Sequence, residues 1–553
     1  MIEADYIGAM AKMGRGDLTA MIGGSRRSIF LSTLVGLAAW LGVAASNALA
    51  IEHGVFPAGG LWSGDTWLMY NGTYEGQRYS GLKDITPTNA AKMKEVCRVK
   101  IGKSGAFQPG MIVVDGTMYL TLDTDTIALD PTNCKIRWHS TYVSEQEPAW
   151  HVNRGVGYLD GRLFRGTGDG RVIALDAKTG KTLWKDVAGN PGFGEFVSAA
   201  PIAWNGLVFV GVAGSDWGIR GRILALDAAT GREVWRFYTI PIGNETGSDS
   251  WKADSGKRGG GGSWTSYALD ISNSELFVPV GNPSPDFVTS DRDGANLFSD
   301  SFVVLNANTG ALKWWYQLRA KDSHDVDLAA SPIIYNNSKG DGMVAAGGKD
   351  GHVYVVDRNS HRLVFKTEVT TIKNDTVDPT EAGVTVCPGV LGGVLWNGPA
   401  FDNNNKSLYV GTVDWCSNLT SQTPQYDPGK PFLGGDFKQE GKGSGWVYAI
   451  DSDSGAVKWK YQAEAPVVAG VTPTAGGVLF TGDMKGNFLV FNSKTGELVH
   501  KVAMGSPLAG GVITYKLNDK QYVAFSTGNV SRLVWGTVGI PTIVIMSGGG
   551  EAN

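Results

Sequence analysis

The chain has 553 residues, a formal net charge of −4 at pH 7 and a hydrophobic fraction of 42%. It has no excess of basic residues, so binding to nucleic acid is set aside as a function. Its 77 glycines, 18 tryptophans and 18 tyrosines suit a turn-rich all-β protein, because tight turns need glycine and large aromatic rings pack sheets together.

The first 50 residues are expected to be a signal peptide with an upstream extension, separate from the fold. Arg26 and Arg27 precede an apolar run from Ile29 to Val43, and Ala48-Leu49-Ala50 offers the small residues after which a signal peptidase cleaves. The mature chain is therefore predicted to begin near Ile51 and to be periplasmic. A membrane anchor is the alternative, although the apolar run is short. General secretion and twin-arginine export both remain open.

A short motif recurs along the rest of the chain: an apolar strand ends in Asp or Asn, a small polar turn follows, and then a large residue, usually Trp. One copy runs from Val172 through Asp176 and Gly180 to Trp184. The Asp or Asn side chain can bond to the turn backbone, and glycine tolerates positive φ, so each copy predicts a β-hairpin. Seven copies end at Trp138, Trp184, Trp235, Trp314, Phe365, Trp459 and His500.

The spacing of these hairpins predicts a β-propeller. Most copies lie roughly 40 to 50 residues apart, which fits four strands per unit in radial repetition. The flanking segments 65–70 and 539–545 supply enough chain for one more unit. We therefore expect residues 51–553 to form a single all-β domain, an eight-bladed propeller with four-stranded antiparallel blades, in which one blade is closed by both chain ends and the tryptophans dock the blades together.

All 4 cysteines lie in the predicted mature chain, and an exported protein can form disulfide bonds. Cys97 ends one predicted strand and Cys134 lies in the next turn, while Cys387 and Cys416 bracket a single insertion. We expect the pairs 97–134 and 387–416, with four free buried thiols as the alternative. No Cys-x-x-Cys-His motif occurs, so no covalent c-type haem is expected on this chain.

Several motifs lie between the repeats, from about Trp67 to Gly528. They are Asn153-Arg154-Gly155-Val156, the run from Gly214 to Gly221, Gly260-Gly261-Gly262-Ser263-Trp264, Gly281-Asn282-Pro283 and Gln521-Tyr522-Val523-Ala524. Together with the repeats, they resemble the quinoprotein alcohol dehydrogenases, which use pyrroloquinoline quinone (PQQ). The resemblance implies an eight-bladed propeller that holds PQQ and a divalent or trivalent cation near its axis.

PQQ is a flat anionic quinone, so its site needs aromatic stacking and cationic partners. The resemblance implies that Trp264 is the stacking floor, that Arg154 pairs with the carboxylates and oxygens of the quinone, and that Lys349 lies beside the quinone oxygens. Gln108 and Ser198 match further polar contacts to the cofactor. The three glycines before the tryptophan would let a large cofactor approach the backbone. The alternatives are a tryptophan of a blade core, a surface arginine and a solvated lysine.

A hard cation takes oxygen ligands, and the resemblance implies that Asp216, Asn282, Asp325 and Asp327 supply them. Asp216 stands where the family usually has a glutamate, so the reach is shorter but the charge is kept. Asp327 matches an extra carboxylate of lanthanide-dependent members, which would favour a trivalent ion. The same Asp-x-Asp-Leu pattern also resembles sugar-oxidising members that need no lanthanide. Ca²⁺ is therefore expected, with a lanthanide possible.

The implied reaction oxidises an alcohol to an aldehyde or ketone. Asp325 matches the catalytic carboxylate that takes the hydroxyl proton while hydride passes to the quinone; an Asp that caps a turn is the alternative. Because the chain has no haem motif, the electrons are expected to leave to a separate acceptor, a soluble cytochrome c or a membrane acceptor.

The chain departs from the family above the quinone. Many members place two adjacent cysteines there, and the aligned pair is Pro148-Ala149. Trp150 or His151 would replace that wall, or would be loop residues without a cofactor contact. Two further positions of the family's cavity correspond to Val467-Val468 and to Leu395, with Asn397 close by. More room is expected than in the small-alcohol oxidisers, and thus a substrate larger than methanol.

Two other functions remain open from sequence. One is a quinoprotein that oxidises sugars, polyols or aldehydes. The other is a non-catalytic periplasmic scaffold, which would not need Arg154, Asp216, Asn282, Asp325 and Lys349 together.

Overall fold

The computed structural model describes residues 66–102, 105–531 and 534–548. All of them belong to one compact unit. The predicted signal peptide, residues 1–50, lies outside the described residues. Within the described ranges, no helix has the length and apolar character needed to cross a bilayer.

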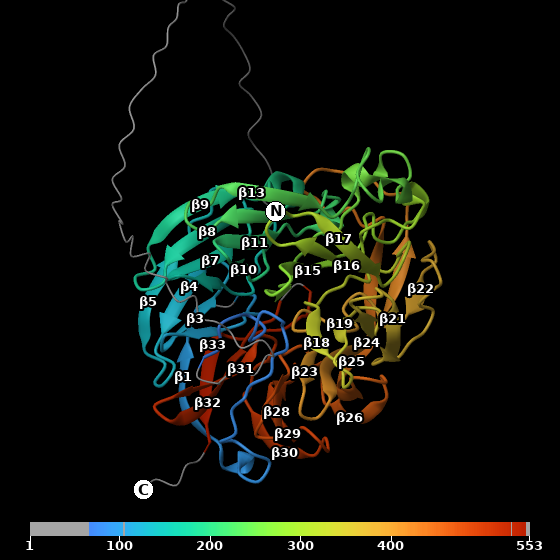
Figure 1. Ribbon diagram of the computed structural model, residues 1–553. Coiled ribbons are helices and arrows are strands. Elements are labelled where there is room, and N and C mark those ends of the chain that lie inside the picture. Colours follow the sequence, from blue (N-terminus) through green and yellow to red (C-terminus); the bar gives the residue numbers. More distant parts are fainter. Residues whose placement is uncertain (1–65, 103–104, 532–533, 549–553) are drawn as a thin grey trace, which may run out of the picture. The chain divides into compact units, whose positions relative to one another are not determined.

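The described strands form eight antiparallel sheets that follow one another in chain order (Figure 1), which confirms the predicted eight-bladed propeller. The first four blades comprise β2 (Ile112–Val114), β3 (Thr117–Thr121), β4 (Asp125–Leu129), β5 (Ile136–Thr141); β6 (Gly157–Leu159), β7 (Arg162–Gly166), β8 (Arg171–Asp176), β9 (Thr182–Val187); β10 (Ile202–Trp204), β11 (Leu207–Gly211), β12 (Arg222–Asp227), β13 (Glu233–Tyr238); and β14 (Ala268–Asp270), β15 (Glu275–Val280), β16 (Ser301–Asn306), β17 (Leu312–Gln317).

The remaining blades include one enlarged sheet, in which β22 (Val384–Val386) extends the sixth blade. Their other strands are β18 (Ile333–Asn336), β19 (Gly342–Gly347), β20 (His352–Asp357), β21 (Leu363–Glu368); β23 (Ala400–Asp402), β24 (Ser407–Ser421), β25 (Gly435–Asp451), β26 (Val457–Ala463); β27 (Thr472–Pro473), β28 (Val478–Gly482), β29 (Asn487–Asn492), β30 (Leu498–Ala503); and β31 (Val512–Leu517), β32 (Lys520–Thr527), β33 (Thr542–Ser547), β1 (Lys94–Lys100). The connections carry short 3₁₀ helices at Ala90–Lys92, Pro191–Phe193, Ser215–Trp217, Ser248–Ser250, Ser255–Arg258 and Ser290–Arg292.

Each of the first seven blades runs from a buried strand to an exposed one. In the first blade every residue of β2 is buried, whereas every residue of β5 is exposed or half-buried. The chain therefore starts these blades at the centre and leaves them at the rim. Because neighbouring strands are antiparallel, the loops between second and third strands lie at the same edge as the connections between blades. The irregular motifs around Arg154, Asp216, Trp264 and Asn282 fall in these two sets of loops, whereas residues 521–524 lie within β32.

The large residue of the hairpin repeat docks each blade on the next. The indole N–H groups of Trp138, Trp184 and Trp235 donate to backbone carbonyls in the turn of the following blade, at 3.0, 3.1 and 3.0 Å. Within the turns, Asp176 Oδ1 accepts from the backbone N–H of Thr179 at 2.8 Å, as the motif predicts. The repeat thus encodes both the hairpin and its contact with its neighbour.

Replacing Gly310 by Ala is expected to lower the free energy of unfolding by about 2–4 kcal/mol, because the turn has positive φ and the ring of Trp235 lies directly beneath it. Gly310 has φ +73°, and a Cβ there would lie 2.6 Å from Trp235 Cε3. The matched control is Gly340→Ala, where φ is +89° but nothing lies within 4 Å of the added carbon. Denaturant unfolding of both variants separates the steric clash with Trp235 from the cost of placing Ala at positive φ. Equal losses in the free energy of unfolding would show that the ring contact contributes nothing.

The eighth blade is closed by both ends of the described chain. β1 pairs with β33, and Tyr515 of β31 donates to the Pro131 carbonyl in the first blade at 2.7 Å. The N-terminal strand of this blade is Lys94–Lys100, so the prediction that segment 65–70 contributes to it was wrong.

Residues 67–80 instead run along the inner strands. Trp67 forms a bridge with Val113 in the first blade, Glu75 accepts from the backbone of Ile334 in the fifth, and Ser80 donates to Pro473 in the seventh. Alternating aromatic residues made this segment look like a strand of a blade, but its partners belong to several different blades.

Both predicted disulfides are present, Cys97–Cys134 and Cys387–Cys416. Cys97 lies in β1 and Cys134 in the turn between β4 and β5. The first bond therefore joins the last blade to the first, rather than two strands of one sheet.

Candidate active site

The segments that lead into the inner strands bring the predicted cofactor residues together. Gln108, Ser198 and Trp264 each lie four residues before the inner strand of their blade, and Arg154 lies three residues before β6. Backbone hydrogen bonds join neighbouring segments, as from Arg154 N to Ser198 O at 2.9 Å. The propeller repeat thus gathers side chains that are far apart in sequence around one axis.

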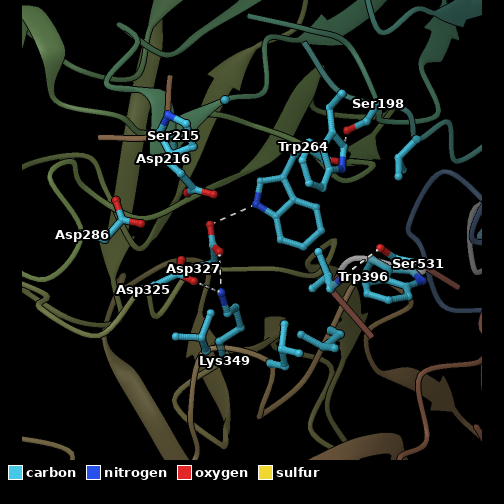
Figure 2. Close-up of a pocket in the computed structure, with 18 of the residues that line it drawn as sticks. Ser198, Ser215, Asp216, Trp264, Asp286, Asp325, Asp327, Lys349, Trp396 and Ser531 are labelled. Atoms are coloured by element: carbon cyan, nitrogen blue, oxygen red, sulfur yellow. Dashed lines mark hydrogen bonds and ion pairs between the residues drawn. The ribbon is translucent and has the colours of Figure 1, made fainter. Parts of the chain in front are cut away.

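These segments line a cavity of about 340 Å³ (Figure 2). Its wall includes the predicted site residues Gln108, Arg154, Ser198, Asp216, Trp264, Asp325, Asp327 and Lys349. The remaining predicted ligand, Asn282, is fully buried, and its backbone N–H donates to Asp327 Oδ1 at 3.1 Å. The structure therefore brings the whole predicted set into one place.

Arg154 organises the aromatic side of the cavity. Its guanidinium donates to Gln108 Oε1 at 2.9 Å, and to Ser198 Oγ and the Trp264 carbonyl, both at 3.1 Å. The guanidinium carbon lies 4.8 Å from the ring centroid of Trp264 and 5.4 Å from that of Trp396, within reach of cation–π attraction. Burial lowers the pKa of Arg154 to about 10, which still leaves it charged at neutral pH.

Lys349 bridges two carboxylates on the opposite side. Its Nζ donates to Asp325 Oδ2 at 2.8 Å and to Asp327 Oδ2 at 3.0 Å, and all three residues are buried. Asp327 Oδ1 accepts from the Trp264 indole at 3.0 Å, which links the two sides of the cavity. Burial opposes the charge on Lys349, but Asp325 and Asp327 outweigh that effect and raise the pKa, so the ammonium group stays protonated.

The connection after β17 presents both of these carboxylates. Asp325 has φ +58° and Asp327 has φ +23°, backbone conformations that favour glycine and that an Asp adopts at some cost. The backbone N–H of Val326, between them, donates to Asp322 Oδ2 at 2.9 Å. This sharp bend is held by the surrounding structure and directs two neighbouring carboxylates into one cavity.

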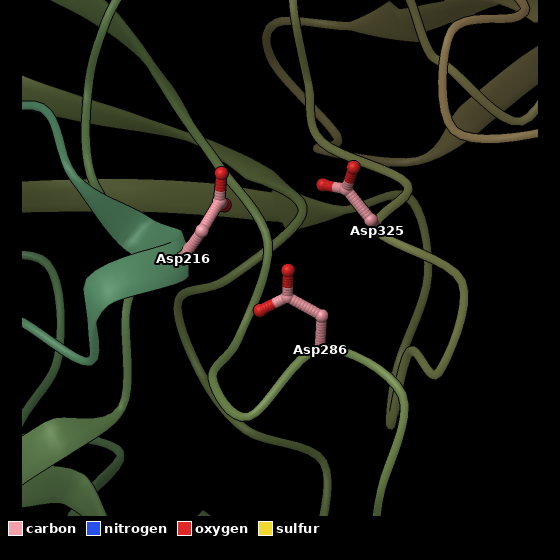
Figure 3. A group of neighbouring side chains, drawn as sticks. All are labelled: Asp216, Asp286 and Asp325. Carbon is pink, nitrogen blue, oxygen red and sulfur yellow. The ribbon is translucent and has the colours of Figure 1, made fainter. Parts of the chain in front are cut away.

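Three carboxylates converge on one point of the cavity (Figure 3). One oxygen from each of Asp216, Asp286 and Asp325 lies within 4.8 Å of the others. Burial, with the nearby charge of Asp327, raises the pKa of Asp216 to about 6. Burial also raises the pKa of Asp286 and of Asp325 well above the usual range, and Asp216 adds to both effects. Such a group of mutually repelling carboxylates is suited to a cation.

The glycines of the Gly260–Gly262 run pack against protein, contrary to the expectation that they open the backbone to a cofactor. A Cβ at Gly260 would lie 2.7 Å from the Asn282 carbonyl, and one at Gly262 would lie 3.1 Å from Gly214 N. The run therefore allows the loops that carry Asp216 and Asn282 to approach each other. Its contribution to the site is the close packing of the ligand loops.

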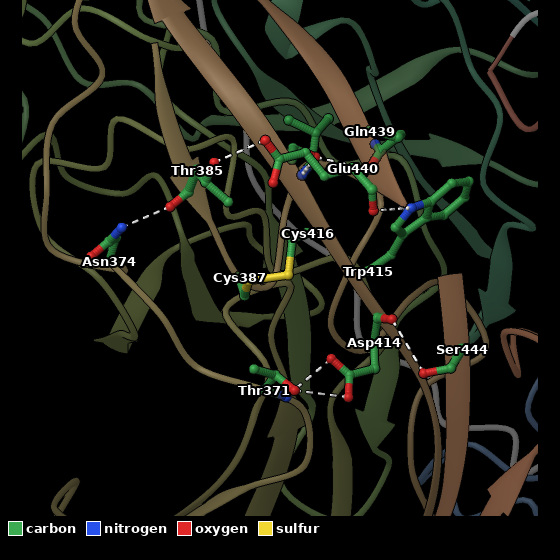
Figure 4. The surroundings of a disulfide bond; sticks show 12 residues. Thr371, Asn374, Thr385, Cys387, Asp414, Trp415, Cys416, Gln439, Glu440 and Ser444 are labelled. Atoms are coloured by element: carbon green, nitrogen blue, oxygen red, sulfur yellow. Dashed lines mark hydrogen bonds between the residues drawn. A yellow bond between two sulfur atoms is a disulfide. The ribbon is translucent and has the colours of Figure 1, made fainter. Parts of the chain in front are cut away.

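An apolar wall, held by the second disulfide, covers another side of the cavity. Cys387 is bonded to Cys416 in β24 (Figure 4), and the segment that follows Cys387 carries Val390, Leu391 and Leu395 of the wall. The tip of the β24–β25 hairpin docks on the carboxylate side, where the backbone N–H of Phe432 donates to the Asp216 carbonyl at 2.6 Å.

The region aligned with the missing cysteine pair contains one cavity residue. Trp150 lines the cavity and makes an edge contact with Trp217, with ring centroids 5.7 Å apart. His151 is instead turned outward, pairs with Asp123 at 2.7 Å and has a side chain that is 64% exposed.

Of the other aligned positions, only Leu395 reaches the cavity. Val467 and Val468 are buried away from its wall. Asn397 is engaged by Tyr70 and Arg78, at 3.0 and 2.9 Å.

Sequence reasoning missed several residues of the site, among them Asp286, Trp396 and Trp535. Trp396 lies four residues before β23, the same repeat position as Gln108, Ser198 and Trp264, so the periodicity held a signal for it. Asp286 follows the predicted ligand Asn282 by four residues but belongs to no motif. Trp535 makes an edge contact with Trp396 at 6.1 Å, and its loop gave no sequence signal.

The residues present fit PQQ and a cation. Arg154 Nε and Asn282 Oδ1 are buried without a hydrogen-bond partner in the described protein, and so is Asp325 Oδ1. The cavity wall holds four carboxylates against two cationic side chains, so a bound cation would offset the excess of negative charge. The aromatic rings and Arg154 offer stacking and carboxylate pairing to a flat anionic quinone.

Comparison with known proteins agrees with this geometry. Residues 67–382 match the family described as glucose/ethanol/alcohol dehydrogenase, beta-propeller domain, and residues 427–537 match the family described as outer membrane protein assembly factor BamB. The lanthanide-dependent methanol dehydrogenase of Methylacidiphilum fumariolicum is 30% identical over 84% of this chain and 84% of its own. The quinoprotein alcohol dehydrogenase PedH of Pseudomonas putida is 29% identical over 82% of this chain and 84% of its own. A solved europium-containing methanol dehydrogenase superposes with a TM-score of 0.81 at 27% identity, and the match covers 87% of this chain and 98% of that one.

Proposed function

The chain belongs to the family of PQQ-dependent quinoprotein alcohol dehydrogenases, and on that premise we propose that it is an exported, periplasmic enzyme that oxidises an alcohol larger than methanol and passes the electrons to a separate acceptor. Its activity is PQQ-dependent alcohol oxidation, with PQQ and a metal ion as cofactors.

The observation that carries the proposed roles is the position of Asp325. Its Oδ2 is held by Lys349 at 2.8 Å, while its Oδ1 has no partner among the described residues, although it is buried in the cavity wall. A carboxylate fixed at one oxygen and free at the other can accept the hydroxyl proton of an alcohol. Bound PQQ would supply the hydride acceptor at this place.

The other predicted residues hold the site in shape. Arg154 pairs with carboxylates of the cofactor, and Gln108 and Ser198 fix the arginine by the hydrogen bonds described above. Trp264 provides a stacking surface whose indole N–H is anchored on Asp327 at 3.0 Å. These roles use charge and orientation alone, which a rigid propeller supplies without rearrangement.

A substrate larger than methanol is supported by the apolar wall. Each additional methylene that becomes buried there should raise kcat/KM about fourfold, from about 0.8 kcal/mol per group. With enzyme loaded with PQQ and metal, we expect kcat/KM to rise along a series of linear primary alcohols from methanol upward.

The matched variant for this series is Leu391→Ala. It should lower kcat/KM for the longer alcohols more than for ethanol, because Leu391 lies in the apolar wall. A series in which methanol or ethanol is best would refute the larger substrate. If sugars or polyols were oxidised faster than any alcohol of the series, the second quinoprotein function would replace the first.

The proposed acceptor is a soluble cytochrome c, since the chain carries no haem-attachment motif. Reduction of a c-type cytochrome by the loaded enzyme during alcohol oxidation checks this; reduction of membrane quinones alone would contradict it. Recovery of the mature chain in the periplasmic fraction checks export.

Two ions are candidates for the metal site. Ca²⁺ is the ion that the sequence favours, with ligands expected at Asp216, Asn282, Asp325 and Asp327. A trivalent lanthanide is supported by the additional carboxylates in the cavity wall, because each further negative ligand favours the higher charge. The relatives named above include one lanthanide-dependent enzyme and one whose name mentions no metal.

A further inference from the structure

Asp286 is a buried carboxylate in the cation cluster that no sequence motif marks. It follows Pro283-Ser284-Pro285, a stretch fixed from two sides: Arg292 Nε donates to the Pro285 carbonyl at 2.9 Å, and Ser284 Oγ donates to the Phe432 carbonyl at 3.2 Å. The loop is therefore held by side-chain hydrogen bonds to backbone carbonyls. None of them uses the Asp286 carboxylate.

The carboxylate of Asp286 is also without a partner. The residue is 1% exposed, and neither of its carboxylate oxygens has a hydrogen-bond partner in the described protein. The guanidinium of Arg292 contacts the backbone carbonyls of Pro285 and Asp286 and the Asn296 side chain instead. A buried carboxylate left without any donor costs free energy unless a cation satisfies it. One of its oxygens is aimed at the same point as those of Asp216 and Asp325 (Figure 3).

Asp327 differs from Asp286 in this respect. Both of its oxygens are in use: Oδ1 accepts from the Trp264 indole and from the backbone of Asn282, and Oδ2 accepts from Lys349. It does not belong to the group of carboxylates whose oxygens lie within 4.8 Å of one another. Its contacts hold the stacking tryptophan and the lysine in place, which is a positioning role.

Given the proposed quinoprotein function, we propose that Asp286 is the third carboxylate ligand of the cation, which is bound by Asp216, Asp286, Asp325 and the amide oxygen of Asn282, and that these three negative ligands select a trivalent lanthanide over Ca²⁺. Asn282 Oδ1 is buried without a partner, as a ligand oxygen would be before the ion binds. Hard oxygen donors suit both ions, so the charge of the ligand set decides between them.

The test is the affinity of the full-length chain for La³⁺ and for Ca²⁺, measured by calorimetry without alcohol, with and without PQQ. The wild type should bind La³⁺ more tightly than Ca²⁺. Asp286→Asn should weaken La³⁺ binding by about 100-fold and Ca²⁺ binding by about tenfold, because the trivalent ion loses more from the removal of a negative ligand. The rise in melting temperature on addition of La³⁺ should shrink in the same variant.

Two further variants make the result specific. Asp291→Asn removes an exposed carboxylate of the same connection and should leave both affinities unchanged. Asp327→Asn should weaken La³⁺ binding less than Asp286→Asn does. The proposal is overturned if Asp286→Asn binds La³⁺ like the wild type, if Asp327→Asn is the more damaging change, or if the wild type binds Ca²⁺ more tightly. Because no turnover is measured, an enzyme that binds La³⁺ as expected but oxidises no alcohol would contradict the proposed function and not this ligand set.

Discussion

Asp325→Asn is expected to reduce kcat about a thousandfold, the range that a general base contributes, while PQQ remains bound. The amide keeps the size of the side chain and can still accept from Lys349, so the cavity should keep its shape. What is lost is the oxygen that takes the hydroxyl proton. Burial raises the pKa of Asp325 in the protein without metal, and a nearby cation would hold the group ionised.

The measurement must separate proton transfer from metal binding, because Asp325 also belongs to the carboxylate cluster. Rates are therefore compared at saturating metal, with bound PQQ quantified by its absorption. Asp254→Asn is the control for loss of one negative charge, since the Asp254 side chain is 83% exposed and is not part of the cavity wall. A variant that retains more than about a tenth of wild-type turnover, with metal and PQQ bound, would exclude Asp325 as the base.

Lys349→Met is expected to produce the largest combined loss of stability and activity. It leaves the buried carboxylates of Asp325 and Asp327 without their shared partner, and breaking a buried ion pair costs about 3–5 kcal/mol. Loss of a positive charge beside the reacting quinone should also lower kcat about 100-fold or more. The ammonium group is charged in the wild type throughout neutral pH, because Asp325 and Asp327 raise its pKa, so the substitution removes a full positive charge there.

Unfolding curves measure the predicted loss of stability, and single-turnover rates measure the predicted loss of activity. Added cation should restore part of the lost stability, because it takes over the charge of the orphaned carboxylates. Lys366→Met, at a half-exposed lysine of β21 outside the cavity wall, is the matched control. Unchanged stability in the metal-free Lys349→Met protein would mean that the two carboxylates are neutral and that the ion pairs do not form.

The fold was predictable because each blade is specified by a short stretch of neighbouring residues. Each hairpin carries its own turn signal, and the docking tryptophan follows at a fixed distance, so seven copies implied the ring. The residues around Arg154 were predictable through a family resemblance, and the structure adds a physical reason: they occupy one repeated position before the inner strands. Segment 67–80 was not predictable, because its partners come from several blades and its own sequence alternates like a strand.

Asp286 shows where sequence reasoning fails. The sequence around an isolated Asp in a loop does not show whether it is a metal ligand or a surface residue. Asp286 becomes a neighbour of Asp216 and Asp325 only because the folded chain brings their three loops together. Asp327 shows the reverse case. Its place in a motif predicts a metal ligand, which stays a prediction, but the hydrogen bonds that its oxygens accept from Trp264, Asn282 and Lys349 cannot be read from its spacing.

The pairing of β1 with β33, which closes the ring, must form before the enzyme can acquire its cofactor. Gln108 lies shortly after β1, and Trp535 lies in the loop before β33, yet both line the same cavity. The cavity wall is complete only after the last blade has been synthesised and has paired with the first strand. Loading of PQQ is therefore a step that follows completion of the chain, and a protein truncated within its final blade would lose the site even though most of the ring remained.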